Sequence, residues 1–355
     1  MIKYLGSKKR LLPVLGGMAS ATECETALDL FTGTTRVAQE FKRRGIYTTC
    51  VDSASYSNIL AQAYVVTNPS DINKDDLRES VAHLNSLPGE AGYFTQTFCE
   101  DSRYFQPKNG ARVDAIRNVI EQDYRDSNLY PILLSELMLA ADRVDSTTGV
   151  QMAYLKQWAP RAHNDLQLRV PELIPGSGQA IQGDAQSTAK AETLDPVDLA
   201  YLDPPYNQHR YFTNYHIWET LVRWDAPEHY GIACKRIDSR DPVTKSPFNR
   251  KREMPVALKS TIEAVRAETL IVSYNNESWV TAEELLSWCG EGREEATLIE
   301  FDSKRYVGAQ IGIYNPSGQR VGKVSHLRNL EFVVVAGPSQ KVQAAVASMR
   351  KGRGM

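Results

Sequence analysis

The chain has 355 residues, of which 42% are hydrophobic and 24% charged, and its formal net charge at pH 7 is −2. This length and apolar content suffice for a large core and more than one domain, and the near-neutral charge excludes a protein that is basic overall. No run of about 18 apolar residues occurs and the start lacks a secretory signal pattern, so we expect an intracellular, cytoplasmic protein without a membrane span.

Cysteine and histidine patterns argue against disulfides and metals. The five cysteines are scattered without a C-x-x-C pair, and the six histidines show no metal-binding spacing. The sequence therefore predicts reduced thiols and no metal site.

Residues 26–52 predict a strand, a loop, a helix and a second strand. Thr26 to Leu30 is a short apolar run, and Thr34 or Thr35 is placed to cap a helix that ends near Gly45. The segment "IYTTCV" then predicts the next strand, which gives a βαβ unit with a parallel pair.

Residues 61–175 show helical periodicity instead. Val113, Ile116, Ile120 and Tyr124 form one stripe, and "YPILLSELMLAADRV" predicts a long apolar helix. We expect an inserted, mainly helical subdomain. Its exit, 170–179, is rich in Pro and Gly and predicts a domain boundary.

Strand patterns return after this exit, at 179–184, 197–203 and 269–275, and a late pair, "ATLIEF" and "NLEFVVVAG", is expected to pair antiparallel at one edge. The predicted fold class is α/β, with a Rossmann-like, mostly parallel sheet and one antiparallel edge strand. The insertion splits the domain that carries this sheet into 1–60 and 176–338, and we expect 339–355 to be a flexible tail, either a frayed helix or a disordered end.

Four predicted strands end in an acid: Asp29, Asp52, Asp184 and Asp203. In an open α/β sheet, ligands bind beyond the carboxyl ends of the strands, so these acids predict one binding edge. Asp52 lies about 20 residues beyond a glycine-containing loop, the spacing of a ribose-binding carboxylate. The loop "FTGTT" has one glycine and suits no pyrophosphate, which points to S-adenosylmethionine as the cofactor.

The stretch "DLAYLDPPYNQHRYF" (198–212) predicts a buried strand that stops at Asp203, Pro204, Pro205 and Tyr206. The prolines stiffen the strand end and leave carbonyls without competing N–H donors. An amino group on a nucleobase can donate to the Asp203 carboxylate and to a proline carbonyl, which stabilises the charge that develops during methyl transfer. Tyr206 offers a ring for stacking.

With these motifs in order, the sequence resembles the Dam-like, alpha-group adenine-N6 DNA methyltransferases, and one restriction-modification branch among them. "KYLGSK" looks like the family's opening motif, which implies that Tyr4 and Lys8 contact the cofactor. "DLFTGTT" resembles the F-x-G-x-G loop, which implies the same for Asp29, Phe31 and Gly33, although Thr35 replaces the last glycine.

In the same resemblance, Asp52 is the ribose acid, Asp184 in "GDA" the acid for the cofactor adenine, and Asp203 also adjoins the cofactor. The resemblance also implies that the inserted helical region 61–175 is a target-recognition subdomain. The implied partners are double-stranded DNA and a cognate restriction endonuclease. Because duplex DNA hides the amino group in the base stack, the base has to be flipped, and Tyr206, Tyr211 and Tyr215 are candidates to line the pocket.

Several further stretches mix aromatics with Arg, Lys and Asn, which stack bases, hold phosphates and read base edges; they are 103–117, 215–225, 273–277 with Asn275, and 304–314. Residues 235–259 hold eight Lys or Arg against three acids, and Arg250, Lys251 and Arg252 are candidates to contact phosphates. The alternative is a solvated loop.

Three other functions stay open. Cytosine N4 is the alternative base, and RNA or a protein amide is the alternative substrate class. A catalytically retired DNA-binding protein on the same fold is the non-enzyme alternative, because fold alone does not establish function.

Overall fold

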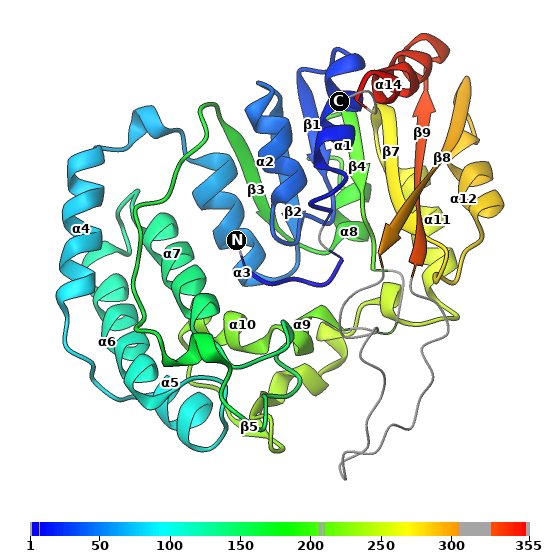
Figure 1. Cartoon of the computed structure of the whole chain (residues 1–355). Coiled ribbons are helices and arrows are strands. Elements are labelled where there is room, and N and C mark those ends of the chain that lie inside the picture. Colours follow the sequence, from blue (N-terminus) through cyan, green and yellow to red (C-terminus); the bar gives the residue numbers. More distant parts are fainter. Residues whose placement is uncertain (1, 7, 206–207, 209, 305–327, 353–355) are drawn as a thin grey trace. The chain divides into compact units, whose positions relative to one another are not determined.

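The computed structural model describes all residues except 1, 7, 206–207, 209, 305–327 and 353–355 (Figure 1). The chain divides into two compact units, each made of discontinuous segments. The first contains residues 1–16, 25–185 and 210–246, and the second contains 17–24, 186–209 and 247–355.

The first unit contains three parallel strands. They are β1 (Thr26–Asp29), β2 (Tyr47–Asp52) and β3 (Gly178–Gln182). β2 pairs with β1, Leu28 opposite Thr49, and with β3, Cys50 opposite Ala180. The predicted βαβ unit is confirmed: α2 (Arg36–Arg43) joins β1 to β2 and buries Val37, Ala38 and Phe41. The chain turns after this helix at Gly45, whose positive φ of 81° suits glycine.

Helices and short helical turns make up most of the residues between β2 and β3. They are α3 (Ser55–Ala61), η1 (Gln62–Val66), η2 (Pro69–Asp71), α4 (Lys74–Ser86), α5 (Tyr93–Thr95), η3 (Gln96–Glu100), α6 (Pro107–Tyr124), α7 (Tyr130–Arg143) and η4 (Pro160–His163). The helical character predicted for 61–175 is confirmed, and Val113, Ile116 and Ile120 are buried on one stripe of α6.

This helical region does not have a core of its own. Its buried side chains form one cluster with Ile2, with Tyr56 of α3 and with Trp218 of α10 (His216–Arg223). The helices predicted as an inserted subdomain therefore belong to the same compact unit as β1, β2 and β3, and the division of the chain differs from the predicted boundaries at 60 and 175.

The last segment of the first unit, 210–246, follows the predicted catalytic tetrapeptide. It contains α9 (Tyr211–Asn214), α10, strands β5 (His229–Tyr230) and β6 (Lys235–Arg236), η5 (Ile237–Arg240) and η6 (Pro242–Thr244). β5 and β6 form an antiparallel hairpin, and the Tyr104 hydroxyl donates to Ala233 O in its loop at 3.2 Å.

The second unit contains four strands. They are β4 (Val197–Leu202), β7 (Ala267–Asn275), β8 (Glu295–Lys304) and β9 (Arg328–Gly337). β4 and β7 are parallel, and β9 runs antiparallel to both β7 and β8. The antiparallel pairing of the last two strands is confirmed, with the reversed strand β9 lying between β7 and the edge strand β8. The strands of the two units are those of the predicted Rossmann-like, mostly parallel α/β class.

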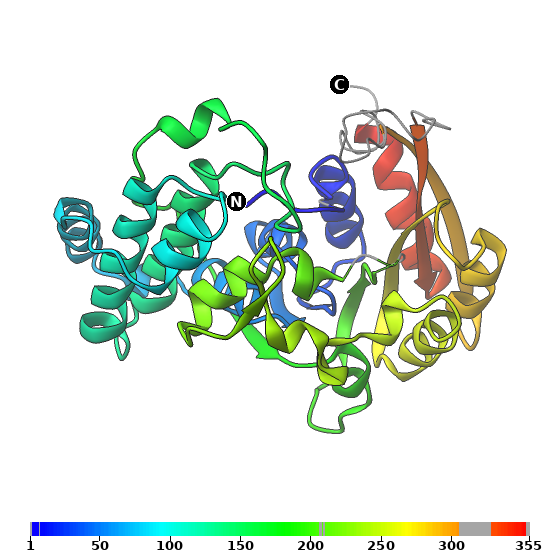
Figure 2. The same cartoon turned by 90° about the horizontal axis from the view of Figure 1, so that it is seen from below.

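The helices associated with the second unit are α8 (Ala185–Lys190), η7 (Pro247–Asn249), α11 (Met254–Ala264), α12 (Ala282–Gly290) and α14 (Ser339–Gly352), and α1 (Leu12–Ala21) crosses the division between the units. Residues 339–352 of the predicted flexible tail are helical. They form α14, which lies beside β9 in Figure 2 and buries Val342 and Ala345 completely. No described helix is long and apolar enough to span a membrane.

Candidate functional site

The carboxyl ends of the three strands in the first unit bring three predicted acids to one edge. Asp29 ends β1, Asp52 ends β2, and Asp184 lies two residues beyond β3. The strands are parallel and in register, Asp29 opposite Cys50 and Asp52 opposite Gln182, and Gly183 N–H donates to Asp52 O at 3.0 Å. The side chain of Asp29 is buried, Asp52 is partly buried and Asp184 is exposed.

The loop after β1 is shaped by two left-handed residues, Gly33 (φ 52°) and Thr35 (φ 60°). A Cβ at Gly33 would lie 3.1 Å from the ring of Tyr4, so the close approach of Tyr4 requires glycine. Thr35 adopts the left-handed conformation without being glycine, at the position where the resembled loop motif has its last glycine. Its hydroxyl accepts a hydrogen bond from Gln39 Nε2 at 2.7 Å, and it does not cap α2 through its side chain.

Asp52 is held in place by backbone amides. Its Oδ2 accepts from Gly33 N–H at 2.8 Å, and its Oδ1 accepts from Ala54 N–H at 2.9 Å. Burial raises the pKa of this carboxyl, and the hydrogen bonds from Ala54 and Gly33 oppose the rise. Gly33 in the loop and Asp52, the acid predicted to bind ribose, are thus joined by a direct hydrogen bond. A carboxylate can accept further hydrogen bonds beyond the two from Gly33 and Ala54.

Three tyrosines stack beside this loop. The Tyr4 ring lies 4.7 Å from that of Tyr215 and 5.2 Å from that of Tyr211, centroid to centroid. Tyr215 is 1% exposed and its hydroxyl accepts from Leu5 N–H at 2.7 Å, so it supports the N-terminal segment. Tyr4 and Tyr211 are partly exposed. The structure therefore places Tyr215, predicted to line a base pocket, in the core.

The N-terminal segment that carries Tyr4 is also fixed by two acids of the helical region. Lys3 N–H donates to both carboxylate oxygens of Asp142 at 3.2 Å. Lys3 Nζ lies 2.9 Å from Asp142 Oδ2 and 3.3 Å from Asp145 Oδ1. Lys8, the other residue predicted in the opening motif, is 6% exposed and lies in the same unit.

In the second unit, Asp203 and Pro204 directly follow β4. Asp203 and Pro205 are partly buried and Pro204 is buried, whereas Tyr206 lies outside the described residues. The strand before them is anchored in the sheet, because Leu202 is opposite Val272 and the Tyr201 hydroxyl donates to Ser273 Oγ at 2.9 Å.

Asn275 ends β7 and is 3% exposed. Its Oδ1 accepts from Glu277 N–H at 3.0 Å and from Ser278 Oγ at 2.9 Å, so the side chain closes the turn after the strand. A role in reading bases, as predicted, remains a proposal.

The predicted phosphate contacts, Arg250, Lys251 and Arg252, are all exposed and immediately precede α11. Arg250 pairs with Glu253, with 2.8 Å between Nη1 and Oε1.

Two charged residues of the stretch 103–117, which is also predicted to contact DNA, are buried and bind backbone groups. Arg117 is 1% exposed; its Nε donates to Leu221 O at 2.8 Å and its Nη2 to Val222 O at 3.0 Å, which caps the end of α10. Asp114 is buried and accepts from the amides of Phe94 and Thr95 at the start of α5. These charged side chains satisfy buried backbone groups.

One buried acid, which binds the turn after Asp52, was not singled out from the sequence. Glu219 on α10 is fully buried and accepts from Ser55 N–H, at 3.0 Å to Oε2. The stretch 215–225 was predicted as functional, and the sequence signal for Glu219 is an acid between Trp218 and Leu221 in the segment "IWETLV".

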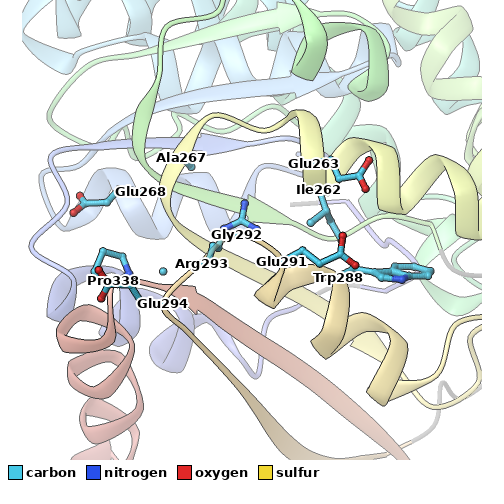
Figure 3. Close-up of a pocket in the computed structure, with 11 residues that line it drawn as sticks. Ile262, Glu263, Ala267, Glu268, Trp288, Glu291, Gly292, Arg293, Glu294 and Pro338 are labelled. Carbon is cyan, nitrogen blue, oxygen red and sulfur yellow. The ribbon is translucent and has the colours of Figure 1, made fainter.

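A pocket of about 460 Å³ in the second unit lies at the amino end of β7 (Figure 3). It is lined by Ala267 at the start of β7, by Trp288 and Arg293, and by several glutamates including Glu263 and Glu291. Asn275 ends the same strand about 26 Å further on, at roughly 3.3 Å per residue. The pocket is therefore separate from the predicted site. Among the described residues, no group of His, Cys, Asp or Glu is arranged to hold a metal ion.

Three modification enzymes are similar to the chain over most of its length. It is 32% identical over 303 residues to the modification methylase StsI of Streptococcus sanguinis, 29% over 311 residues to the type II methyltransferase M.FokI of Planomicrobium okeanokoites, and 30% over 291 residues to the type II methyltransferase M.NlaIII of Neisseria lactamica. These alignments cover 80%, 81% and 78% of the chain.

The chain spans 45% of the length of StsI, 46% of M.FokI and 84% of M.NlaIII. The family model for the D12 class N6 adenine-specific DNA methyltransferases matches residues 4–279, which include the Tyr4 segment, the Gly33 loop, Asp52 and Asp203. The resemblance predicted from the motifs is confirmed, and the chain belongs to the D12 class of N6 adenine-specific DNA methyltransferases.

Proposed function

We propose that the chain transfers a methyl group from S-adenosylmethionine to the N6 amino group of adenine in duplex DNA. The observation that carries this proposal is the Asp203–Pro204–Pro205 corner, which follows β4 with its acid partly exposed, in a chain of the D12 class. Acids at strand ends are common in α/β proteins. The Gly33 loop, Asp52 and the tetrapeptide at 203–206, in this order along the chain, are a more specific sign of the methyltransferase family.

The residues of the first unit fit the cofactor. Tyr4 and Phe31 supply rings, the Gly33 loop allows a close approach, Asp52 takes the ribose hydroxyls, and Asp184 takes the cofactor adenine. Asp52 supports this assignment best, because two amides orient its carboxylate while it stays partly exposed. When bound, S-adenosylmethionine supplies an electrophilic methyl group.

The catalytic residues act on the amino group of the flipped adenine. The Asp203 carboxylate and the Pro204 carbonyl accept hydrogen bonds from the two N–H groups of this amine. These hydrogen bonds favour a pyramidal nitrogen and stabilise the positive charge that develops on it. Pro204 and Pro205 restrict the backbone, so these acceptors need little reorganisation. Tyr206 stacks on the base.

The first experiment measures cofactor binding and substrate class together. Calorimetry should show that the chain binds S-adenosylmethionine, and a tritiated methyl group should enter plasmid DNA and not ribosomal RNA. Absence of S-adenosylmethionine binding would favour a catalytically inactive DNA-binding protein on the same fold. Transfer of the methyl group into RNA would overturn the assignment of DNA as the substrate.

We place the chain in a restriction-modification system with a cognate endonuclease, because its relatives are named modification methylases and type II methyltransferases. Genomic DNA from a host that expresses the chain should carry N6-methyladenine within one short, recurring sequence. Methylation scattered over unrelated sequences would contradict site-specific modification.

A further inference from the structure

The turn between Asp52 and α3 lacks the residue that ordinarily stabilises such a junction. The position before the helix is Ala54, which has no side-chain oxygen to accept from the first amides of α3. Two carboxylates supply the acceptors instead. Asp52 accepts from Ala54 N–H at 2.9 Å, and Glu219 accepts from Ser55 N–H at 3.0 Å.

Glu219 reaches this turn from a distant part of the sequence. It lies 164 residues after Ser55, on α10, which follows the predicted catalytic tetrapeptide. Its side chain is fully buried and pairs with Arg223, with 2.8 Å between Oε1 and Nε. Burial raises the pKa of Glu219 and the charge of Arg223 opposes that rise. A buried carboxylate with these partners has few alternative positions, so it is a rigid acceptor.

Other contacts hold the same turn. Gln182 Nε2 donates to Ser55 Oγ at 3.0 Å, and Arg223 Nε lies 3.4 Å from the same oxygen. The amide of Ser55 is therefore fixed by Glu219, and its hydroxyl by groups on β3 and α10. Asp52 is three residues away and shares the turn.

We propose that Glu219 is a positioning residue of the cofactor site, which fixes the Asp52 carboxylate through the amide of Ser55. The inference rests on the proposed binding of S-adenosylmethionine by Asp52. Its consequence is that α10 influences cofactor affinity without touching the cofactor.

Three substitutions separate the geometry of Glu219 from its charge. Glu219→Gln keeps an oxygen within reach of Ser55 N–H and loses the charge, whereas Glu219→Asp keeps the charge and is one methylene too short. Glu219→Ala loses both. We expect Ala and Asp to weaken S-adenosylmethionine binding roughly tenfold and to raise KM for the cofactor more than they lower kcat, and Gln to stay within about threefold of the wild type.

The matched control is Glu136, a second buried glutamate of the same unit. Its Oε1 accepts from Arg169 N–H at 2.9 Å and from Arg143 Nη2 at 2.6 Å, and it lies on α7. Glu136→Gln and Glu136→Ala should lower thermal stability as the Glu219 variants do and leave cofactor affinity unchanged.

Calorimetry on the full chain measures the cofactor affinity of each variant, and steady-state kinetics measures its KM and kcat. The inference is overturned if Glu219→Asp binds the cofactor as tightly as Glu219→Gln, or if the Glu136 variants weaken binding equally. Should Glu219→Ala fail to fold, the comparison of Gln with Asp still decides. A wild-type chain that does not bind S-adenosylmethionine would instead refute the proposed function itself.

Discussion

Thr35, in the loop after β1, stands where the resembled loop motif of the family has its last glycine. Its left-handed backbone costs about 1–2 kcal/mol relative to glycine. The buried hydrogen bond from Gln39 contributes about 1 kcal/mol and the buried methyl about 0.8 kcal/mol in the opposite direction. These contributions nearly cancel, which explains how threonine is tolerated where the loop conformation favours glycine.

Substitution of Thr35 tests this balance. Thr35→Gly should change the free energy of unfolding by less than about 1 kcal/mol, because strain and contacts are lost together. Thr35→Val keeps the strain and leaves Gln39 without its acceptor, so it should cost about 1–3 kcal/mol. Urea unfolding measures both, and a Gly variant less stable than the Val variant would contradict the account.

His216 predicts a pH dependence of stability. It is fully buried, its Nε2 lies 3.0 Å from Gln151 O, and burial lowers its pKa to about 3. The unfolded chain binds a proton near pH 6.5 and the folded chain does not, so stability falls as the pH drops below that value. Between pH 7 and 5 the loss from this group is about 2 kcal/mol, at about 1.36 kcal/mol per pH unit.

The measurement is the difference in unfolding free energy between the wild type and His216→Gln at pH 7 and at pH 5. The difference cancels the opposite contributions of Asp52, Asp142 and Glu219, whose pKa values are raised by burial. The variant should lose less stability on acidification. Identical losses in the two proteins would mean that His216 does not carry the effect.

At the scale of elements, α6 supports the fold and does not present its Arg117 to DNA. Arg117→Ala leaves the last carbonyls of α10 without donors and Glu121 without its buried partner, so it should cost about 3–5 kcal/mol. Arg125, which directly follows α6 and is 68% exposed, is the control, and its alanine variant should stay within about 0.5 kcal/mol. A stable Arg117→Ala protein with weakened DNA binding would contradict this role.

The elements that periodicity predicts well are those with strong apolar runs. β1, β4 and β7 lie where their runs predicted, because a buried parallel strand is apolar on both faces. For the tail helix α14 the sequence predicts only a frayed helix or a disordered end, because the segment is rich in alanine and its buried face at Val342 and Ala345 is small.

The site could be predicted in part for a similar physical reason. Asp29 and Asp52 end strands, Asp184 and Asp203 lie just beyond strands, and strand ends can be read from the chain. The burial of Tyr215 and the bond from Ser55 to Glu219 depend on packing between segments distant in sequence, which no local pattern encodes.

At the scale of the whole molecule, the net charge of −2 requires DNA binding to depend on local basic segments. If Lys251 and Arg252 contact phosphates, replacing both with glutamine should reduce the slope of log affinity against log salt by about 2, at roughly 0.9 per contact. Fluorescence anisotropy at several salt concentrations measures this slope. An unchanged slope would mean that Lys251 and Arg252 do not contact phosphates and that the segment is a solvated loop.

The central claim is that Asp203 drives methyl transfer to adenine N6. Duplex DNA incubated with the full chain and S-adenosylmethionine, digested to nucleosides and analysed by mass spectrometry, tests it most directly. The account predicts N6-methyldeoxyadenosine with the wild type and with Asp198→Ala, altered near the amino end of β4, and none with Asp203→Ala. N4-methyldeoxycytidine as the product, or undiminished methylation by Asp203→Ala, would contradict it.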